Sequence, residues 1–281
     1  MNSAITKGES ADAARPIGVF DSGIGGLTVV SALRTLLPDE SIYYIGDTAR
    51  IPYGSRSEAT VQRYSLEIAA MLLEDRAKTV VVACNTASAV ALPQLEKSLP
   101  VTVTGVILPG ARAAIAKTRT GIVGVIGTRA TIKSGAYERA LRSLNPDVRV
   151  TTRACPLLVP LIEEGWLESA ITDEIIMQYL GPLVEEGIDT LVLGCTHYPL
   201  LRNAIARLLG DGVALVDSAE NCASAVRELL IRENLCAPET NGGKLQVALT
   251  DPPDNFLRVV REALQLEVGE VQLRDVTVHA L

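Results

Sequence analysis

The chain has 281 residues, of which 48% are hydrophobic and 21% are charged, values typical of a globular protein with a buried core. Its net charge of −7 argues against a dedicated nucleic-acid binder, which would carry a basic surface, but leaves room for a local basic patch. Residues 1–15 lack the apolar segment of a signal peptide, and no apolar run reaches 18 residues. We therefore expect a cytoplasmic protein that does not cross a membrane.

The first half of the sequence alternates short Val- and Ile-rich runs with Ala-, Leu- and Glu-rich stretches, an order typical of α/β layering. After residues 1–15, expected to be a disordered extension, the apolar runs predict strands at 17–20, 41–45 and 79–83. The other stretches predict helices at 27–37, 58–75 and 87–92, with a glycine-rich turn at 21–26 and a polar loop at 46–57. This repetition predicts a parallel doubly wound sheet.

The second half repeats the pattern. Strands are predicted at 121–126, 148–153, 190–194 and 213–216. One helix is predicted after the turn at 127–131 and ends near residue 143. Further helices are predicted at 157–164, 169–186 and 199–209, and from Ala219 onward. Two further strands, near 244–249 and 271–278, are expected to return to the sheet of the first half.

The two halves share strand-end motifs at similar offsets. The strand before Cys84-Asn-Thr matches the strand before Cys195-Thr-His, 111 residues later, and the strand ends at Asp21 and Thr128 are 107 residues apart. The repeat predicts two pseudosymmetric, doubly wound α/β domains with mainly parallel sheets and an active site in the cleft between them. We place residues 16–107 and 218–281 in the first domain and residues 108–217 in the second.

Cys84 and Cys195 each follow a predicted strand and precede a helix. A helix N-terminus carries unpaired N–H groups and partial positive charge, which favour a thiolate and can lower a cysteine pKa. A single cysteine at such a place is often an inert buried thiol. Two in matching places could instead flank one carbon, so that one removes a proton and the other returns a proton to the opposite face.

Other chemistries fit the sequence less well. The five cysteines are odd in number and widely spaced without a CxxC pair, which disfavours a disulfide framework or a thiol redox site. The two histidines provide few ligands for zinc. The turn Gly23-x-Gly25 lacks the third glycine of a dinucleotide fingerprint, and no lysine lies at a strand end to hold pyridoxal phosphate. Cys155, Cys222 and Cys236 have no motif around them and are interpreted as structural.

Several motifs together resemble those of the glutamate racemases, within the aspartate/glutamate racemase superfamily. They are Phe20-Asp-Ser-Gly-Ile-Gly-Gly-Leu-Thr28, Gly46-Asp-Thr-Ala-Arg50, Pro52-Tyr-Gly54, Ala83-Cys-Asn-Thr-Ala-Ser88, Ile126-Gly-Thr128 and Gly194-Cys-Thr-His-Tyr-Pro199. The resemblance extends from about residue 16 to the C-terminus.

The resemblance implies acid–base catalysis by Cys84 and Cys195 without a metal or another cofactor. Cys84 would handle the proton of the D-enantiomer and Cys195 that of the L-enantiomer, assisted by Asp21 and His197. The residues implied to bind substrate are Asp21, Ser22, Tyr53, Gly54, Asn85, Thr86, Thr128, Thr196 and His197. Asp47, Glu163 and Thr131 are implied as supporting residues.

The implied activity is the interconversion of L- and D-glutamate, which supplies D-glutamate for peptidoglycan. One alternative is a racemase of aspartate or a related acidic compound. Another is a regulatory protein on the same fold, because some members of the family inhibit DNA gyrase, although this sequence offers no support for that role. The resemblance also implies a homodimer, and we expect no direct contact with nucleic acid.

Overall fold

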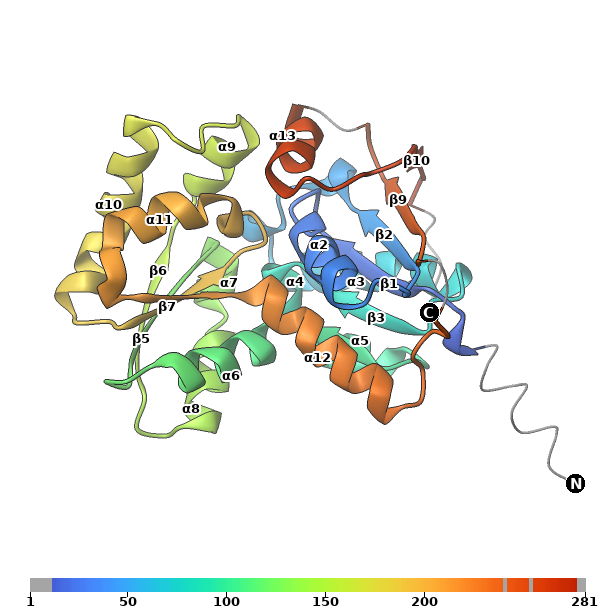
Figure 1. Ribbon diagram of the computed structural model, residues 1–281, viewed down its shortest axis with the longest axis horizontal. Helices are drawn as coiled ribbons and strands as arrows, with labels where there is room; N and C mark the ends of the chain where they lie inside the picture. Colours follow the sequence, from blue (N-terminus) through green and yellow to red (C-terminus); the bar gives the residue numbers. More distant parts are fainter. Residues whose placement is uncertain (1–11, 240–241, 253–254, 277–281) are drawn as a thin grey trace, which may run out of the picture.

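The computed structural model of the protein describes residues 12–239, 242–252 and 255–276. Figure 1 shows two β-sheets side by side, each accompanied by helices. The first sheet has six strands in the order β10-β9-β2-β1-β3-β4, and every strand pair is parallel. Its strands are β1 (Ile17–Asp21), β2 (Ile42–Gly46), β3 (Thr79–Val82), β4 (Val103–Gly105), β9 (Leu245–Leu249) and β10 (Val271–Leu273).

The second sheet has four parallel strands in the order β6-β5-β7-β8. They are β5 (Ile122–Gly127), β6 (Arg149–Ala154), β7 (Thr190–Gly194) and β8 (Ala214–Asp217). This order repeats β2-β1-β3-β4 of the first sheet, so β1 corresponds to β5 and β3 to β7. The carboxyl ends of parallel strands meet at one edge of a sheet. Cys84 therefore follows β3, and Cys195 follows β7, the strand at the corresponding position of the second sheet.

Helices and short 3-10 turns connect the strands. The helices are α2 (Leu27–Leu36), α3 (Glu58–Glu74), α4 (Asn85–Val90), α5 (Leu92–Ser98), α6 (Ile107–Lys117), α7 (Arg129–Lys133), α8 (Ala136–Leu144), α9 (Leu158–Glu163), α10 (Ala170–Glu185), α11 (Arg202–Leu209), α12 (Ser218–Arg232) and α13 (Asn255–Leu264). The 3-10 turns are η1 (Thr48–Arg50), η2 (Tyr53–Ser55), η3 (Tyr198–Leu201) and η4 (Gly210–Gly212). Within the described residues, none of these helices has the length and apolar content needed to cross a bilayer.

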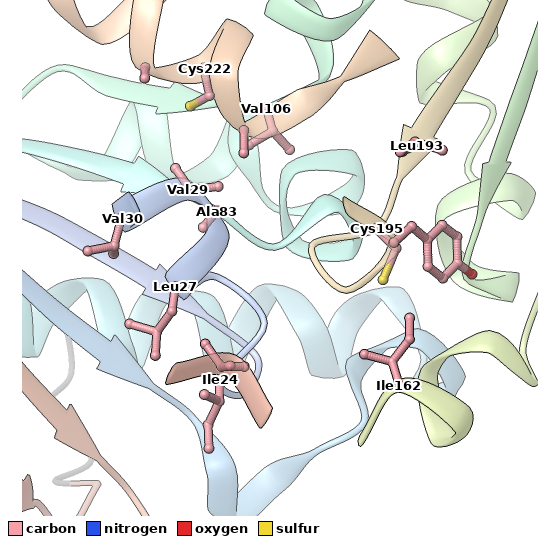
Figure 2. Close-up of a cluster of buried hydrophobic side chains, with 14 of the residues drawn as sticks. Ile24, Leu27, Val29, Val30, Ala83, Val106, Ile162, Leu193, Cys195 and Cys222 are labelled. Carbon is pink, nitrogen blue, oxygen red and sulfur yellow. The ribbon is translucent and has the colours of Figure 1, made fainter. Parts of the chain in front are cut away.

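One of the three buried apolar clusters spans both halves. α12 leaves the second sheet after β8 and packs against α2 and α6, while α13 contacts α2 and α9 (Figure 1). One cluster of buried side chains contains Leu27 and Val29 of α2 together with Leu193, Cys195 and Cys222 (Figure 2). Burial of apolar surface on both sides of the junction stabilises the relative position of the halves.

Most predicted elements lie within about two residues of their expected positions. β4, α6 and α13 were not predicted. β4 has only three residues, and Pro109 and Gly110 interrupt the start of α6, so both segments resemble loops in sequence. The helix predicted at 87–92 begins earlier, at Asn85, and continues as α5. The strand predicted at 271–278 ends at Leu273, and residues 277–278 lie outside the described part.

The prediction of disorder up to residue 15 is wrong for residues 12–15, while residues 1–11 lie outside the described part. Ala13 is buried, and Arg15 Nε donates a hydrogen bond to the carbonyl oxygen of Arg76 at 2.7 Å. This short segment therefore packs beside the loop between α3 and β3. The domain boundaries near residues 107 and 217 stay a prediction.

A buried ion pair joins the start of the first sheet to distant segments. Lys78 Nζ pairs with Glu40 and donates hydrogen bonds to the carbonyl oxygens of Ala13, at 2.6 Å, and Leu235, at 2.7 Å. Glu40 also accepts a hydrogen bond from the backbone N–H of Ala237 at 2.7 Å. Burial lowers the pKa of Lys78, and the neighbouring Glu40 partly offsets this effect. Such a pair is costly to break because the remaining charge stays buried.

We predict that Glu40→Ala lowers the free energy of unfolding by about 3–5 kcal/mol, because it leaves the Lys78 ammonium buried without its carboxylate. Urea denaturation followed by far-UV circular dichroism measures the change. Glu262→Ala, which removes an exposed ion pair with Arg258, serves as the control and should cost less than about 1 kcal/mol. Equal losses in the two variants would contradict the structural role of the Lys78–Glu40 pair.

Candidate active site

A cavity of about 450 Å³ opens at the carboxyl ends of the strands, between the two halves. Residues that follow β1, β2, β3 and β9 form one wall, and residues that follow β5, β6 and β7 form the other. The lining residues are Ser22, Gly23, Ile24, Thr48, Ile51, Pro52, Tyr53, Gly54, Ser55, Cys84, Asn85, Thr86, Thr128, Arg129, Pro156, Val159, Pro160, Glu163, Cys195, Thr196, His197, Asp251 and Pro252. The cavity therefore contains both cysteines that the sequence singled out.

Cys84 follows β3 and caps the N-terminus of α4. Its sulfur accepts a hydrogen bond from the backbone N–H of Ala87 at 3.5 Å, and its thiol donates to Ser22 Oγ at 3.6 Å. Burial and the charge of Asp21 raise the pKa of Cys84 to about 12, although its hydrogen bonds with Ala87 and Ser22 oppose the shift. The expectation that the helix N-terminus lowers this pKa is therefore wrong, because burial outweighs the effect of the helix.

Asp21 ends β1 and lies behind the cavity wall rather than on its surface. One carboxylate oxygen accepts the backbone N–H of Gly23 at 3.1 Å, and the other accepts the hydroxyl of Thr196 at 3.3 Å. Burial raises the pKa of Asp21, while the positive charge of His197 opposes the shift. Asp21 thus connects the first half of the molecule to the loop that carries Cys195.

Cys195 follows β7 and lies beside a histidine–glutamate pair (Figure 2 shows Cys195). Its sulfur is 3.8 Å from His197 Nδ1, and His197 Nε2 is 3.3 Å from Glu163 Oε1. Burial lowers the pKa of His197, but the hydrogen bonds to Cys195 and Glu163 outweigh it and raise the pKa to about 10. His197 is therefore protonated at neutral pH, and Cys195 lies next to a group that can exchange a proton with it.

Three threonine hydroxyls meet where the two walls touch. Thr86 Oγ1 lies 2.9 Å from Thr128 Oγ1 and 3.1 Å from Thr131 Oγ1, and the last two are 3.0 Å apart. Gly54 packs against this cluster, since a Cβ atom there would lie 2.7 Å from the Cβ of Thr128. The close approach of η2 to α7 therefore requires a glycine at residue 54.

Asn85 presents a free donor in the cavity wall. Its Oδ1 accepts a hydrogen bond from the hydroxyl of Tyr137 at 2.6 Å. Its Nδ2 is buried and has no hydrogen-bond partner among the described residues. Because a buried donor without a partner is costly, this amide is suited to bind an acceptor on a ligand, such as a carboxylate oxygen.

Asp47 holds the cavity wall in place from outside. It accepts hydrogen bonds from the hydroxyl of Tyr53, from Thr250 Oγ1 at 3.0 Å and from Arg50 Nε at 2.7 Å. Arg50 also pairs with Glu67. The Tyr53 hydroxyl is thus already engaged, so this residue offers its ring and backbone to a ligand.

All but three of the predicted site residues line the cavity. The exceptions are Asp21, Asp47 and Thr131, which contact lining residues from behind. Sequence analysis missed Arg129, Val159 and Asp251. Arg129 directly follows the Thr128 motif and Val159 lies in the predicted helix that carries Glu163, which are usable signals, whereas Asp251 comes from a segment without a recognisable pattern.

The arrangement suits proton transfer to and from carbon. Two thiols lie in one cavity, and one is backed by a carboxylate while the other adjoins an imidazolium. Hydroxyl and amide groups around them can hold carboxylate oxygens and an ammonium group. Among the described residues, no three His, Cys, Asp or Glu side chains are grouped as ligands for a metal ion.

Comparisons with known proteins place this site in a family context. The model of the Asp/Glu/Hydantoin racemase family matches residues 27–226. The chain is 51% identical to the glutamate racemase of Geobacter metallireducens over 257 residues, which cover 92% of this chain and 95% of the relative. It is 47% identical to the glutamate racemase of Neisseria meningitidis serogroup A over 260 residues, covering 92% and 96% of the two chains.

Solved structures give the same result. The glutamate racemase isoform RacE1 of Bacillus anthracis superposes with a TM-score of 0.90 at 42% identity, covering 94% of this chain and 99% of that one. The glutamate racemase of Francisella tularensis, solved in complex with D-glutamate, gives a TM-score of 0.88 at 37% identity, with 94% and 98% coverage. An aspartate racemase of Picrophilus torridus, at 17% identity and a TM-score of 0.53, shares only the fold.

We predict that the Cys84 thiol alkylates far more slowly with iodoacetamide at pH 8 than the exposed Cys236. A thiol with a pKa of about 12 holds roughly 10³-fold less thiolate than an ordinary thiol of pKa about 8.5. Asp21→Asn should speed the reaction at Cys84, because it removes a negative charge that disfavours the thiolate. Peptide mass spectrometry measures each cysteine separately. Asp211→Asn, at an exposed position, is the control, and an equal acceleration there would refute the role of Asp21.

We predict that the His197 ring titrates far above the usual pKa of about 6.5, and that Glu163→Gln lowers its pKa. Because the folded-state pKa of about 10 exceeds the unfolded value, the contribution of His197 to stability is complete below pH ~6.5 and is lost as the pH rises through about 10. NMR of the imidazole protons measures the pKa, and the sequence has only two histidines to assign. Glu164→Gln, at the exposed neighbouring carboxylate, should leave the pKa unchanged.

Proposed function

The chain belongs to the Asp/Glu/Hydantoin racemase family, and we propose that it interconverts L- and D-glutamate through Cys84 and Cys195. Glutamate racemase is the activity of its close relatives, which match over more than nine-tenths of both chains. In this family the product D-glutamate serves peptidoglycan synthesis. The observation that carries the proposed mechanism is the pair of thiols that follow corresponding strands, β3 and β7, and line one cavity.

Each thiol serves one face of the substrate α-carbon. In the L-to-D direction, Cys195 as thiolate accepts the α-proton, and the neutral Cys84 thiol donates a proton to the opposite face. The raised pKa of Cys84 keeps this thiol protonated and ready to act as the acid. In the D-to-L direction the roles exchange, with His197 positioned to return a proton to Cys195.

The cavity must also stabilise negative charge that develops on the substrate when the α-proton leaves. The Asn85 amide nitrogen, buried without a partner among the described residues, can donate to the α-carboxylate. The hydroxyls of Thr86 and Thr128, one on each wall of the cavity, are further possible donors. Donors that are already oriented in a partly closed cavity stabilise such charge better than water does.

Asp21 and His197 make the two thiols unequal. The carboxylate of Asp21 disfavours a thiolate at Cys84, whereas the protonated His197 supplies a proton partner for Cys195. Glu163 keeps His197 charged and Asp47 holds Tyr53 in place, so both act as positioning residues.

A racemase of aspartate is the second candidate, and it is disfavoured because aspartate racemase shares only the fold with this chain. Circular dichroism with a panel of acidic amino acids separates the two activities. The homodimer and the cytoplasmic location are also proposals that rest on the family resemblance. The family resemblance is likewise the only support for gyrase inhibition.

We predict that Cys84→Ser and Cys195→Ser each lower the rate of racemisation by about 10²–10⁴-fold, since each variant loses one of the two proton-transfer groups. In D₂O, Cys84→Ser should still exchange the α-proton of L-glutamate and Cys195→Ser that of D-glutamate, both without inversion. NMR of the α-proton measures exchange, and circular dichroism measures inversion. Cys236→Ser, at an exposed position, is the control. Full racemisation by either active-site variant would overturn the mechanism.

A further inference from the structure

Positive charge is concentrated in one part of this acidic protein. Residues 112–153 contain nine Lys or Arg and two Asp or Glu, a formal charge of +7, whereas the whole chain carries −7. The rest of the chain therefore carries −14. Such an asymmetry produces a local positive potential on a molecule that otherwise repels anions.

All nine cationic residues of this segment are exposed, and we call them the basic region. They are Arg112, Lys117, Arg119, Arg129, Lys133, Arg139, Arg142, Arg149 and Arg153. They lie on or next to α6, α7, α8 and β6, which are neighbours, since α8 packs on α6 and α7, and α7 contacts β6 (Figure 1). The basic region therefore belongs to the second half of the molecule, with Arg149, which pairs with Glu186, on the face of β6 that α10 covers.

Arg129 is the member of the basic region that lines the active-site cavity. It is the first residue of α7, directly after Thr128, and it is the only Lys or Arg among the residues that line the cavity. Its guanidinium is exposed and makes no ion pair or hydrogen bond with the residues that the structure describes. An unpaired guanidinium at this position is free to attract an anion.

The formal charges of the residues that line the cavity balance, so the attraction by Arg129 acts locally, at its own wall. Glu163 is paired with His197, so these two residues contribute little net charge. Asp251 lines the opposite wall, after β9, and is exposed to solvent. Free glutamate carries two carboxylates and one ammonium, so it has a net charge of −1 at neutral pH.

We propose that Arg129 attracts the anionic substrate into the cavity, and that the other cations of the basic region extend this attraction outward. The inference rests on the proposed glutamate racemase activity. Arg129 acts as a positioning residue at the entrance and takes no part in proton transfer. Its contribution appears in KM and in kcat/KM, because it raises the local concentration of substrate without changing the chemistry at the α-carbon.

Two physical constraints define how the effect of Arg129 on kcat/KM must behave. Exposed charges are screened over about 8–10 Å at ionic strengths of 0.1–0.15 M, so the effect must weaken as salt is added. The equilibrium constant between two enantiomers in water is one. Any change in kcat/KM must therefore be equal for L- and D-glutamate, and a difference between the two directions would indicate an assay artefact.

The test measures racemisation kinetics by circular dichroism for Arg129→Gln, Arg129→Lys and Arg129→Glu, each at low and at high ionic strength. At low salt, Arg129→Gln should lower kcat/KM roughly two- to fivefold through KM, with kcat nearly unchanged. Arg129→Glu should lower it further, and Arg129→Lys should restore it. The differences should shrink in ~0.5 M salt.

Arg227→Gln is the matched control, because it removes one exposed cation from α12, outside the cavity lining. The double variant Lys133→Gln/Arg142→Gln tests the wider basic region, with Lys97→Gln/Arg227→Gln as its control. The first double variant should raise KM in a salt-dependent way, and the second should not.

The role of Arg129, the role of the wider basic region and the proposed function are each contradicted by a different result. An Arg129→Gln variant that matches Arg227→Gln, loses activity through kcat alone or ignores salt would overturn the role of Arg129. A Lys133→Gln/Arg142→Gln variant that matches its control would overturn the role of the wider region. Failure of the wild-type protein to racemise glutamate at all would instead overturn the proposed function. Thermal denaturation by circular dichroism checks that each variant is folded.

Discussion

Close contact between the two halves is the constraint on which the rest of the site depends. The halves meet through backbone at two places where a side chain would not fit. A Cβ atom on Gly54 would lie 2.7 Å from the Cβ of Thr128, and one on Gly25 would lie 2.6 Å from the His197 ring. These contacts bring hydroxyls and thiols from separate sheets into one cavity of about 450 Å³. The shared apolar core beneath them, with α12 and α13 packed across the junction, holds that spacing.

Burial at this junction also explains the electrostatics. A thiol or carboxyl group removed from water resists ionisation, so the pKa values of Asp21 and Cys84 are both raised. On the other side, Glu163 and Cys195 surround His197 with groups that favour its charged form. Four strands of the two sheets follow the same order, but the proton affinities on the two sides of the cavity differ. This difference lets one thiol hold its proton while the other has a proton partner beside it.

Much of the fold and the positions of the two cysteines could be predicted from the sequence, because short local motifs indicate them. Strand-end positions for Cys84 and Cys195 followed from short apolar runs, and the repeated motifs indicated that the two would share a cleft. The raised pKa of Cys84 could not be predicted, because it depends on burial and on Asp21, which is distant in sequence. The same holds for β4, too short to leave a pattern, and for Asp251, which reaches the cavity only when β9 joins the first sheet.

The shared strand order, β2-β1-β3-β4 in one sheet and β6-β5-β7-β8 in the other, has an evolutionary consequence. Two identical subunits related by a twofold axis would be obliged to present the same residues to both sides of a ligand. Joining two copies in one polypeptide removes that obligation, since each copy can mutate independently. By strand register Asp21 corresponds to Gly127, and the residues after the two cysteines, Asn85-Thr86 and Thr196-His197, differ between the halves. A single polypeptide with two halves of matching strand order can thus present different chemistry to the two faces of a chiral carbon.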